Sequence, residues 1–294
     1  MKVALLMLCH RSPEQINEFI YTVRNANINI FIHVDKKFDI SKDITKDETV
    51  FVLDDNKRHS VEWAKYSQIE ATLELIKYAM STDKYDFFLL ISGQDFPLTS
   101  STRLISYLES NKADGFLNLF PSLNYQLGKP NNHDKNNDLY YPDWIMGRYG
   151  VSRIIRRVWV EITGGYNHTF RCFKRKTIND MKFYFGSQWW GFSGQYMEWM
   201  MNYLGEHTEY CEYFKSCSTP DESFFHTLYM NSPFSENRTD YLHYIDWSEG
   251  KNSPKTLTCG DLDKMFSSGK LMARKIDSEY DRNIIPEIKK RIGS

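Results

Sequence analysis

The stretch YDFFLLISGQDFPLTS, residues 85–100, decides the fold expected of this chain. Its first eight residues are mostly apolar, which is typical of a strand buried in a sheet. Gly93 and Pro97 interrupt the apolar run, and a helix is predicted directly after it, over residues 99–110. A buried strand joined to a helix by a short turn is the repeating unit of a parallel α/β sheet.

The same alternation of strands and helices surrounds that stretch. Apolar runs of strand length occur at residues 2–8, 29–35, 49–54 and 114–120. Apolar residues at helical spacing predict helices over 12–24 and 60–81, the first with Ser12 as its N-cap and Pro13 in the first position. Because no internal repeat or linker interrupts the pattern, we expect one α/β domain over residues 1–294.

Composition narrows the class of protein. Hydrophobic residues make up 41% of the chain and charged residues 26%, which is enough for a large core and argues against wholesale disorder. The formal net charge of −1 gives no overall attraction to nucleic acid, so an anion site has to be local. The five cysteines are odd in number and form no Cys-x-x-Cys pair, which favours reduced thiols and a reducing compartment.

Polar residues follow the predicted strands where each strand ends. His10 and Arg11 follow the first strand, His33 and Asp35 close the second, and Asp95 follows the strand at 85–92. Ligands of parallel α/β sheets bind beyond the carboxyl ends of the strands. Each residue alone is explained by turn or cap chemistry, but their convergence favours a nucleotide site.

The segment STPDESFFHTL, residues 218–228, has two interpretations. Thr219, Pro220 and Glu222 match a capping box at the start of a helix. Alternatively, Glu222 is a catalytic base held at that helix start, where the helix dipole would keep its carboxylate ionised. These eleven residues alone favour the cap.

A basic and aromatic segment follows a surface loop predicted over residues 121–142. Residues 143–162 carry Arg148, Arg153, Arg156 and Arg157 among tryptophan and isoleucine residues. Such a segment can bind an anionic acceptor or lie on an anionic membrane, and it can equally be a solvated helix face with an ordinary apolar stripe. The apolar run at 2–8 is too short to span a membrane and has no signal-peptide cleavage site.

Six motifs, in order, resemble the core-2/I-branching enzymes and peptide-O-xylosyltransferases, which form glycosyltransferase family 14. They are IFIHVDKK (30–37), SVEWAKYSQIEATLELIKYA (60–79), YDFFLLISGQDFPLTS (85–100), GSQWWGFSGQY (186–196), STPDESFFHTL (218–228) and GDLDKMFSSGKLMARKID (260–277). The stretches 121–185 and 203–217 carry no such resemblance.

The resemblance implies a GT-A-like, Rossmann-like fold with a nucleotide-binding half at 1–120 and an acceptor-binding, catalytic half at 121–294. It also implies an inverting transferase that uses a UDP-sugar, with N-acetylglucosamine favoured and xylose or another hexose as the alternative. Glu222 falls on the family's base, which reverses the preference for a cap. Lys275, with Arg274 beside it, falls on the cations that meet the donor diphosphate. Lys255 stands where relatives commonly have Arg, which puts bidentate phosphate binding at that position in doubt.

The expected site combines the residues at the strand ends with the residues that the family resemblance implies. The donor-binding residues are His10, Arg11, His33, Asp35, Val61, Asp95, Lys255, Arg274 and Lys275. The acceptor-binding residues are Trp189, Trp190, Trp247 and Arg148, with core packing as the alternative for the tryptophans.

No metal or other cofactor is expected, because the family works without a divalent ion and Asp95 lacks a second acid two residues away. Asp261 and Asp263 form a literal Asp-x-Asp, which we interpret as a helix start. With no membrane anchor before the first strand, the expected location is a bacterial cytoplasm, with contact at the inner face of the membrane through 143–162. The acceptor would be a glycan of surface or capsular polysaccharide synthesis, with a lipid-linked glycan as one form of it. A non-catalytic nucleotide- or glycan-binding module is the remaining alternative.

Overall fold

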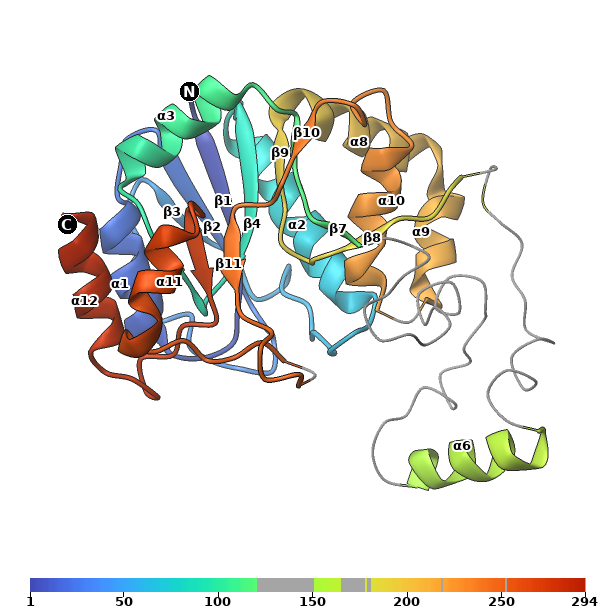
Figure 1. The fold of residues 1–294 in the computed structure, drawn as a ribbon. Coiled ribbons are helices and arrows are strands. Elements are labelled where there is room, and N and C mark those ends of the chain that lie inside the picture. The colour runs from blue at the N-terminus through green and yellow to red at the C-terminus, as the bar shows by residue number, and fades with distance from the viewer. Residues whose placement is uncertain (121–150, 165–177, 179–180, 218, 252, 294) are drawn as a thin grey trace.

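The structure is a computed structural model of the chain. It describes residues 1–120, 151–164, 178, 181–217, 219–251 and 253–293. Three sheets and the helices around them make up this part of the chain (Figure 1). The predictions for residues 121–150, including Arg148 and the loop at 121–142, lie outside the described residues.

A seven-stranded sheet with the order β10-β6-β9-β4-β1-β2-β3 forms the centre of the molecule (Figure 1). Its strands are β1 (Val3–Cys9), β2 (Ile28–Val34), β3 (Val50–Val52), β4 (Phe87–Ser92), β6 (Gly115–Phe116), β9 (Gly191–Ser193) and β10 (Arg238–Thr239). Strands β3, β2, β1 and β4 run parallel, while β9 is antiparallel to both β4 and β6. The mostly parallel α/β sheet expected from the sequence is therefore confirmed.

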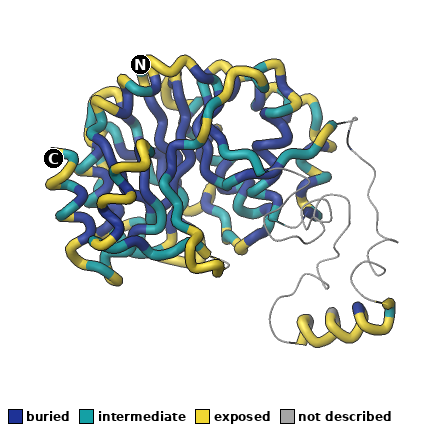
Figure 2. The backbone as a smooth tube through the Cα atoms, in the orientation of Figure 1, coloured by how far each residue is buried: buried dark blue, intermediate teal, exposed yellow. Residues whose placement is uncertain are grey.

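Helices cover both faces of this sheet because the side chains of its strands alternate between them. Val3, Leu5 and Met7 of β1 pack with α1, α3, α11 and α12, and Ala4 and Leu6 pack with α2, α8, α9 and α10. The helices are α1 (Pro13–Val23), α2 (Ser67–Thr82), α3 (Ser101–Asn111), α8 (Gly194–Glu206), α9 (Thr208–Lys215), α10 (Phe224–Met230), α11 (Leu262–Ser267) and α12 (Ile284–Ile292). Figure 2 shows the buried backbone between these two helical layers.

Two small sheets and two short 3-10 helices bring later segments to the central sheet. A three-stranded sheet has the order β11-β12-β5, from β5 (Asp95–Pro97), β11 (His243–Ile245) and β12 (Met272–Arg274). A two-stranded sheet pairs β7 (Leu119–Phe120) with β8 (Phe185–Gly186). The 3-10 helices are η2 (Pro220–Glu222) and η3 (Cys259–Asp261). Because β5 directly follows β4, the three-stranded sheet places β12 beside the carboxyl end of β4.

Helix α6 (Val151–Ile162) confirms a helix within the basic and aromatic segment. It lies between two stretches that are not described and is drawn apart from the layers around the sheet (Figure 1). Among the described residues, no helix is both long and apolar enough to cross a bilayer.

Three sequence predictions need correction. The helix predicted from residue 60 begins only at Ser67, because the preceding residues bond to the end of β2, with His59 N donating to His33 Nε2 at 2.8 Å. The strand predicted over 114–120 is two strands, β6 and β7, which pair with different sheets. Ser12 does not cap α1 through its side chain, since its backbone is left-handed at a φ of 55°.

Candidate active site

The carboxyl ends of β1, β2 and β4 meet at one edge of the central sheet. The amide of Asp35 donates to Cys9 O at 2.9 Å, and the amide of Gly93 donates to Leu8 O at 3.0 Å. These bonds hold His10 and Arg11 next to Asp35 on one side and to the turn after β4 on the other. The strand-end residues that the sequence predicted to converge therefore do converge.

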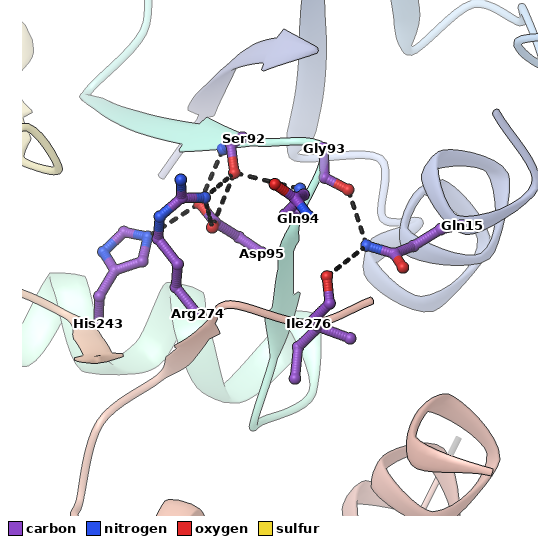
Figure 3. Close-up of polar contacts among 8 residues, drawn as sticks. All are labelled: Gln15, Ser92, Gly93, Gln94, Asp95, His243, Arg274 and Ile276. Carbon is purple, nitrogen blue, oxygen red and sulfur yellow. Dashed lines mark hydrogen bonds and ion pairs between the residues drawn. The ribbon is translucent and has the colours of Figure 1, made fainter. Parts of the chain in front are cut away.

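The segment after β12 is joined to the same edge. Buried Gln15 donates from Nε2 to Gly93 O at 2.8 Å and to Ile276 O at 3.2 Å (Figure 3). The amide of Ile276 also donates to Gln94 O at 2.8 Å. These contacts bring Arg274 and Lys275 to residues that precede them by about 180 positions in the chain.

Arg274 is fixed by contacts on several sides. Its Nη1 donates to Asp95 Oδ1 at 2.9 Å and to Ser92 Oγ (Figure 3). Its guanidinium carbon lies 4.3 Å from the centre of the Trp189 ring. Asp95 is fully buried and also lies 3.3 Å from His243 Nε2. Burial raises the pKa of Asp95, but Arg274 and His243 outweigh burial and hold that pKa below its ordinary value. Asp95 therefore orients Arg274 and is not itself exposed to a ligand.

Lys275 lies near two other basic residues, Arg11 and His10. Among the described residues its ammonium forms no hydrogen bond or ion pair. Partial burial lowers its pKa, and Arg11 and Arg274 lower it further. The pKa of His10 is lowered by burial and then by Arg11, with smaller effects from Lys275 and Lys37. Of this group, Arg11 is neutralised by Asp277 at 2.6 Å. The unsatisfied positive charge suits an anion such as a diphosphate.

The side of the site formed by β2 consists of Asp35 and a strap, residues 59–61. Asp35 Oδ1 accepts from the amides of Lys37 at 3.0 Å and Val61 at 3.3 Å, and Lys37 Nζ lies 3.4 Å from Asp35 Oδ2. His33 is buried and accepts from the strap, and burial, followed by His59, lowers its pKa to about 4. His33 is therefore a neutral structural residue beneath the strand end, and it does not face a ligand.

The sequence predictions did not include a second feature on the β2 side of the site. The exposed ring of His10 lies 5.3 Å from the ring of Phe38, between centroids, so two aromatic side chains stand together beyond β1 and β2. Lys37 and Phe38 come directly after the His-Val-Asp strand end, and that position is the signal that could have identified them.

Lys255 reaches the same region through β11 and β12. Its amide donates to Asp246 O at 2.8 Å, and the amide of Leu257 donates to Lys275 O at 2.9 Å. However, Lys255 Nζ donates to Asp261 Oδ1 at 2.6 Å, which raises the pKa of Lys255. The charge of Lys255 is thus already partly neutralised, unlike that of Lys275.

Asp261 confirms the helix start expected at Asp-x-Asp. Its side chain forms a reciprocal capping box with Thr258 and accepts a hydrogen bond from Lys255 Nζ. Asp263 forms an ion pair with Arg291 at 2.7 Å. In the described part of the chain, no three His, Cys, Asp or Glu side chains are grouped to hold a metal ion.

Glu222 stands in a different environment. It ends η2, and α10 begins only at Phe224, so the predicted capping box is wrong: Thr219 has a left-handed backbone with a φ of 51° and no capping side-chain bond. The expectation that a helix dipole keeps Glu222 ionised is also wrong. Burial, followed by the nearby charge of Asp221, raises the pKa of Glu222 to about 8. No described residue hydrogen-bonds or ion-pairs with its carboxyl group.

The turn of Glu222 is connected to the cationic edge of the sheet by two routes. The amide of Thr219 donates to Ala64 O at 3.3 Å, just beyond the strap that bonds to Asp35. From the other direction, Trp190 packs on Phe225 at 5.0 Å between ring centroids, while its neighbour Trp189 holds Arg274. Glu222 and the cations thus belong to one packed unit, although no hydrogen bond or ion pair among the described residues joins Glu222 to Arg274 or Lys275 directly.

The tryptophans expected to bind an acceptor have three different roles. Trp190 is 1% exposed and stacks on Phe192, so it is a core residue and cannot be a sugar platform in this structure. Trp189 is 6% exposed and supports Arg274. Trp247 is 54% exposed, in the loop that also carries Lys255, and remains a candidate. Burial, which the sequence pattern does not show, separates the three.

Comparison with known proteins identifies the class. The sequence profile of the Core-2/I-Branching enzyme family matches residues 3–268. The chain therefore belongs to this family. The α/β sheet with helices on both faces agrees with the GT-A-like fold that the resemblance implied.

Its relatives include several xylosyltransferases. A xylosyltransferase of Ciona intestinalis is 21% identical over 97% of this chain and 33% of its own length. Human xylosyltransferase 1 is 20% identical over 98% of this chain and 30% of its own length. The chain thus spans about a third of the length of these relatives. A crystal structure of mouse xyloside xylosyltransferase 1 in its apo form aligns with a TM-score of 0.40 and 8% identity, over 93% of this chain and 97% of that one.

Proposed function

We propose that this protein is a metal-independent inverting glycosyltransferase that moves a sugar from a UDP-sugar to a hydroxyl group of a glycan acceptor. One contrast carries the proposal. Among the described residues, Lys275 has no ion-pair or hydrogen-bond partner for its ammonium group and lies beside a fixed Arg274, whereas the carboxyl group of Glu222 has no partner and its pKa is raised to about 8. Inverting transfer needs a cationic group for the leaving diphosphate and a separate base for the incoming hydroxyl.

The proposed step balances without a further reactant. The deprotonated Glu222 carboxylate takes the proton of the acceptor hydroxyl as its oxygen attacks the anomeric carbon of the donor. The bond from that carbon to the diphosphate oxygen breaks, and its electron pair leaves with UDP. Arg274 and Lys275 stabilise the negative charge that grows on the diphosphate. A raised pKa makes Glu222 a stronger base than an ordinary carboxylate.

Two groups of residues at the edge of the sheet would bind different parts of the donor. Arg274, Lys275 and Arg11 would meet the diphosphate, and Asp35 with Val61 would hold the nucleoside. His10 and Phe38 offer a ring surface for a base. Lys255 would contribute only if it shares its charge with Asp261.

The donor sugar and the acceptor are finer proposals. The xylosyltransferase relatives support UDP-xylose as the first donor to test, ahead of the UDP-N-acetylglucosamine favoured by the sequence alone. We place the acceptor in surface or capsular polysaccharide synthesis, with a lipid-linked glycan reached through residues 143–162. A non-catalytic nucleotide-binding module is the alternative, and turnover of any donor would exclude it.

A ligand panel tests this function directly. Thermal unfolding is measured with UDP, UDP-xylose, UDP-N-acetylglucosamine and UDP-glucose, with and without EDTA, and UDP release is followed in parallel. We expect a rise in melting temperature with UDP and with one UDP-sugar, unchanged by EDTA, and slow release of UDP from that sugar. UDP release that stops in EDTA and returns with Mg²⁺ or Mn²⁺ would contradict metal independence. Binding without any turnover would favour the non-catalytic module.

A further inference from the structure

Helix α6 exposes a continuous apolar face. Its exposed apolar side chains recur at helical spacing, so they lie on one side of the helix. They are Val151 at 72%, Ile154 at 64%, Ile155 at 49%, Val158 at 50%, Trp159 at 42% and Ile162 at 76%. Figure 2 shows α6 exposed along almost its whole length. Helices of globular proteins normally bury such a face, so this one indicates a binding surface.

The opposite side of α6 is cationic and partly covered. Arg153 and Arg157 are exposed there, with Arg157 Nε 3.6 Å from Glu161 Oε1. Val160 is buried, at 5% exposed, and at about 100° per residue it lies opposite Val151. The exposed apolar face therefore lies on the side of α6 opposite to Val160.

The border between the two faces carries a shallow hollow. Arg153, Arg157 and Glu161 line it from the polar side, and Ile154 and Val158 line it from the apolar side. Guanidinium groups beside aliphatic side chains match the region of a bilayer where lipid phosphates meet the acyl chains. Trp159 lies at another edge of the apolar face, and tryptophan is common at the interface between membrane and water.

We infer that α6 lies in the surface of an anionic lipid bilayer, with its apolar face among the acyl chains. Charge selects this partner. The sequence of α6 holds three arginines and one glutamate, whereas the whole chain has a formal net charge of −1. Attraction to anionic lipid is thus local to this helix. A helix of 12 residues is too short to span a bilayer, so it lies in the plane of the surface.

This inference deepens the proposed function, because an enzyme docked on a membrane can reach a lipid-linked acceptor. The inference rests on the proposed function only for the lipid-linked acceptor, and membrane binding itself does not depend on it. Vesicle binding needs no donor, and UDP release from a UDP-sugar needs no vesicle. A failure of one is therefore distinguishable from a failure of the other.

Co-sedimentation of the full chain with vesicles tests the inference. The vesicles contain phosphatidylcholine alone or with phosphatidylglycerol, and binding is measured at low and high salt. We expect binding to the vesicles with phosphatidylglycerol, weakened at high salt because ions screen the arginines. Ile155→Glu should reduce the partition coefficient about tenfold or more, since an apolar side chain no longer enters the acyl region. Arg153→Gln and Arg157→Gln should each reduce it by roughly fivefold for anionic vesicles.

Tyr21→Glu is the matched control, since Tyr21 is 52% exposed on α1, away from α6 in sequence, and its replacement should leave binding unchanged. Light scattering of the free protein reports its oligomeric state. Absence of sedimentation, equal binding to both vesicle types, or equal loss with Tyr21→Glu and Ile155→Glu would each overturn the inference. It would also be overturned by a dimer that Ile155→Glu makes monomeric, since a second copy would then cover the apolar face.

Discussion

Arg274 and Glu222 carry the two opposite charges of the proposed reaction, and their surroundings are opposite too. Arg274 is held by Asp95, Ser92 and Trp189. The carboxyl group of Glu222 makes no hydrogen bond or ion pair with the described residues. A cation that has to meet a diphosphate gains from being fixed beforehand. A base must not be stabilised as an anion, because every donor or cation beside it would lower its pKa.

Replacement of Glu222 should give the largest effect of the variants that test this contrast. Glu222→Gln keeps the size of the side chain but cannot accept a proton as the carboxylate does, so kcat should fall about 10²–10⁴-fold. UDP affinity should stay unchanged, because the cationic side is untouched. Transfer kinetics and calorimetric titration with UDP measure the two quantities. Ordinary turnover by Glu222→Gln would remove Glu222 from the mechanism.

Removing the side chains that hold Arg274 should mainly lower the unfolding free energy of the protein. Asp95→Ala leaves a mostly buried guanidinium without its buried partner, which should cost about 3 kcal/mol of unfolding free energy. Ser92→Ala, which removes one hydroxyl acceptor, should cost only about 1 kcal/mol. Urea unfolding of the two variants measures the difference. If both cost the same, Asp95 is not the main support of Arg274.

The pH dependence of transfer tests the raised pKa. With a pKa of about 8 for Glu222, kcat/KM should fall as the pH drops below that value. Between pH 8 and pH 6 the deprotonated fraction falls by a factor of about 50, and the rate should follow it. Asp221→Asn should move the midpoint to lower pH, because the charge of Asp221 raises the pKa of Glu222. A midpoint that stays in place in this variant would show that burial acts alone.

Stability should depend on pH in a related way. The folded-state pKa of Glu222 lies above its ordinary value of 4.5, so the protonated carboxyl favours the folded state at pH below about 4.5. This contribution is lost as the pH rises through about 8. Glu222→Gln should remove that loss, so its unfolding free energy relative to the original protein should increase between those pH values. Parallel pH profiles for the two proteins would contradict a buried, unpartnered Glu222.

Lys275 should give the smallest effect. Lys275→Met removes a cation with no partner among the described residues, so folding should change little. UDP binding should weaken roughly tenfold, the scale of one lost charge-assisted hydrogen bond. Lys36→Met, an exposed lysine after β2, is the matched control and should leave UDP binding unchanged. Equal effects from Lys275→Met and Lys36→Met would place the diphosphate elsewhere.

The sequence alone determined what depends on neighbouring residues. Periods of apolar residues predicted β1, β2, β4, α1 and α3, and the order of strands and helices predicted the α/β class. Six motifs pointed to the glycosyltransferase family, and they placed Glu222, Arg274 and Lys275 together in one proposed site. These signals are local in the chain, so they could be read without the fold.

The tertiary structure decided what depends on distant residues and on burial. It showed that Asp95 faces Arg274 from 179 positions away, that Trp190 is core and that Glu222 caps no helix. It also set the pKa of Glu222, since removal of water from a carboxyl group is a property of its surroundings in three dimensions. Hydrophobic periodicity specifies which face of an element is buried, but only packing determines which charged groups share that buried space.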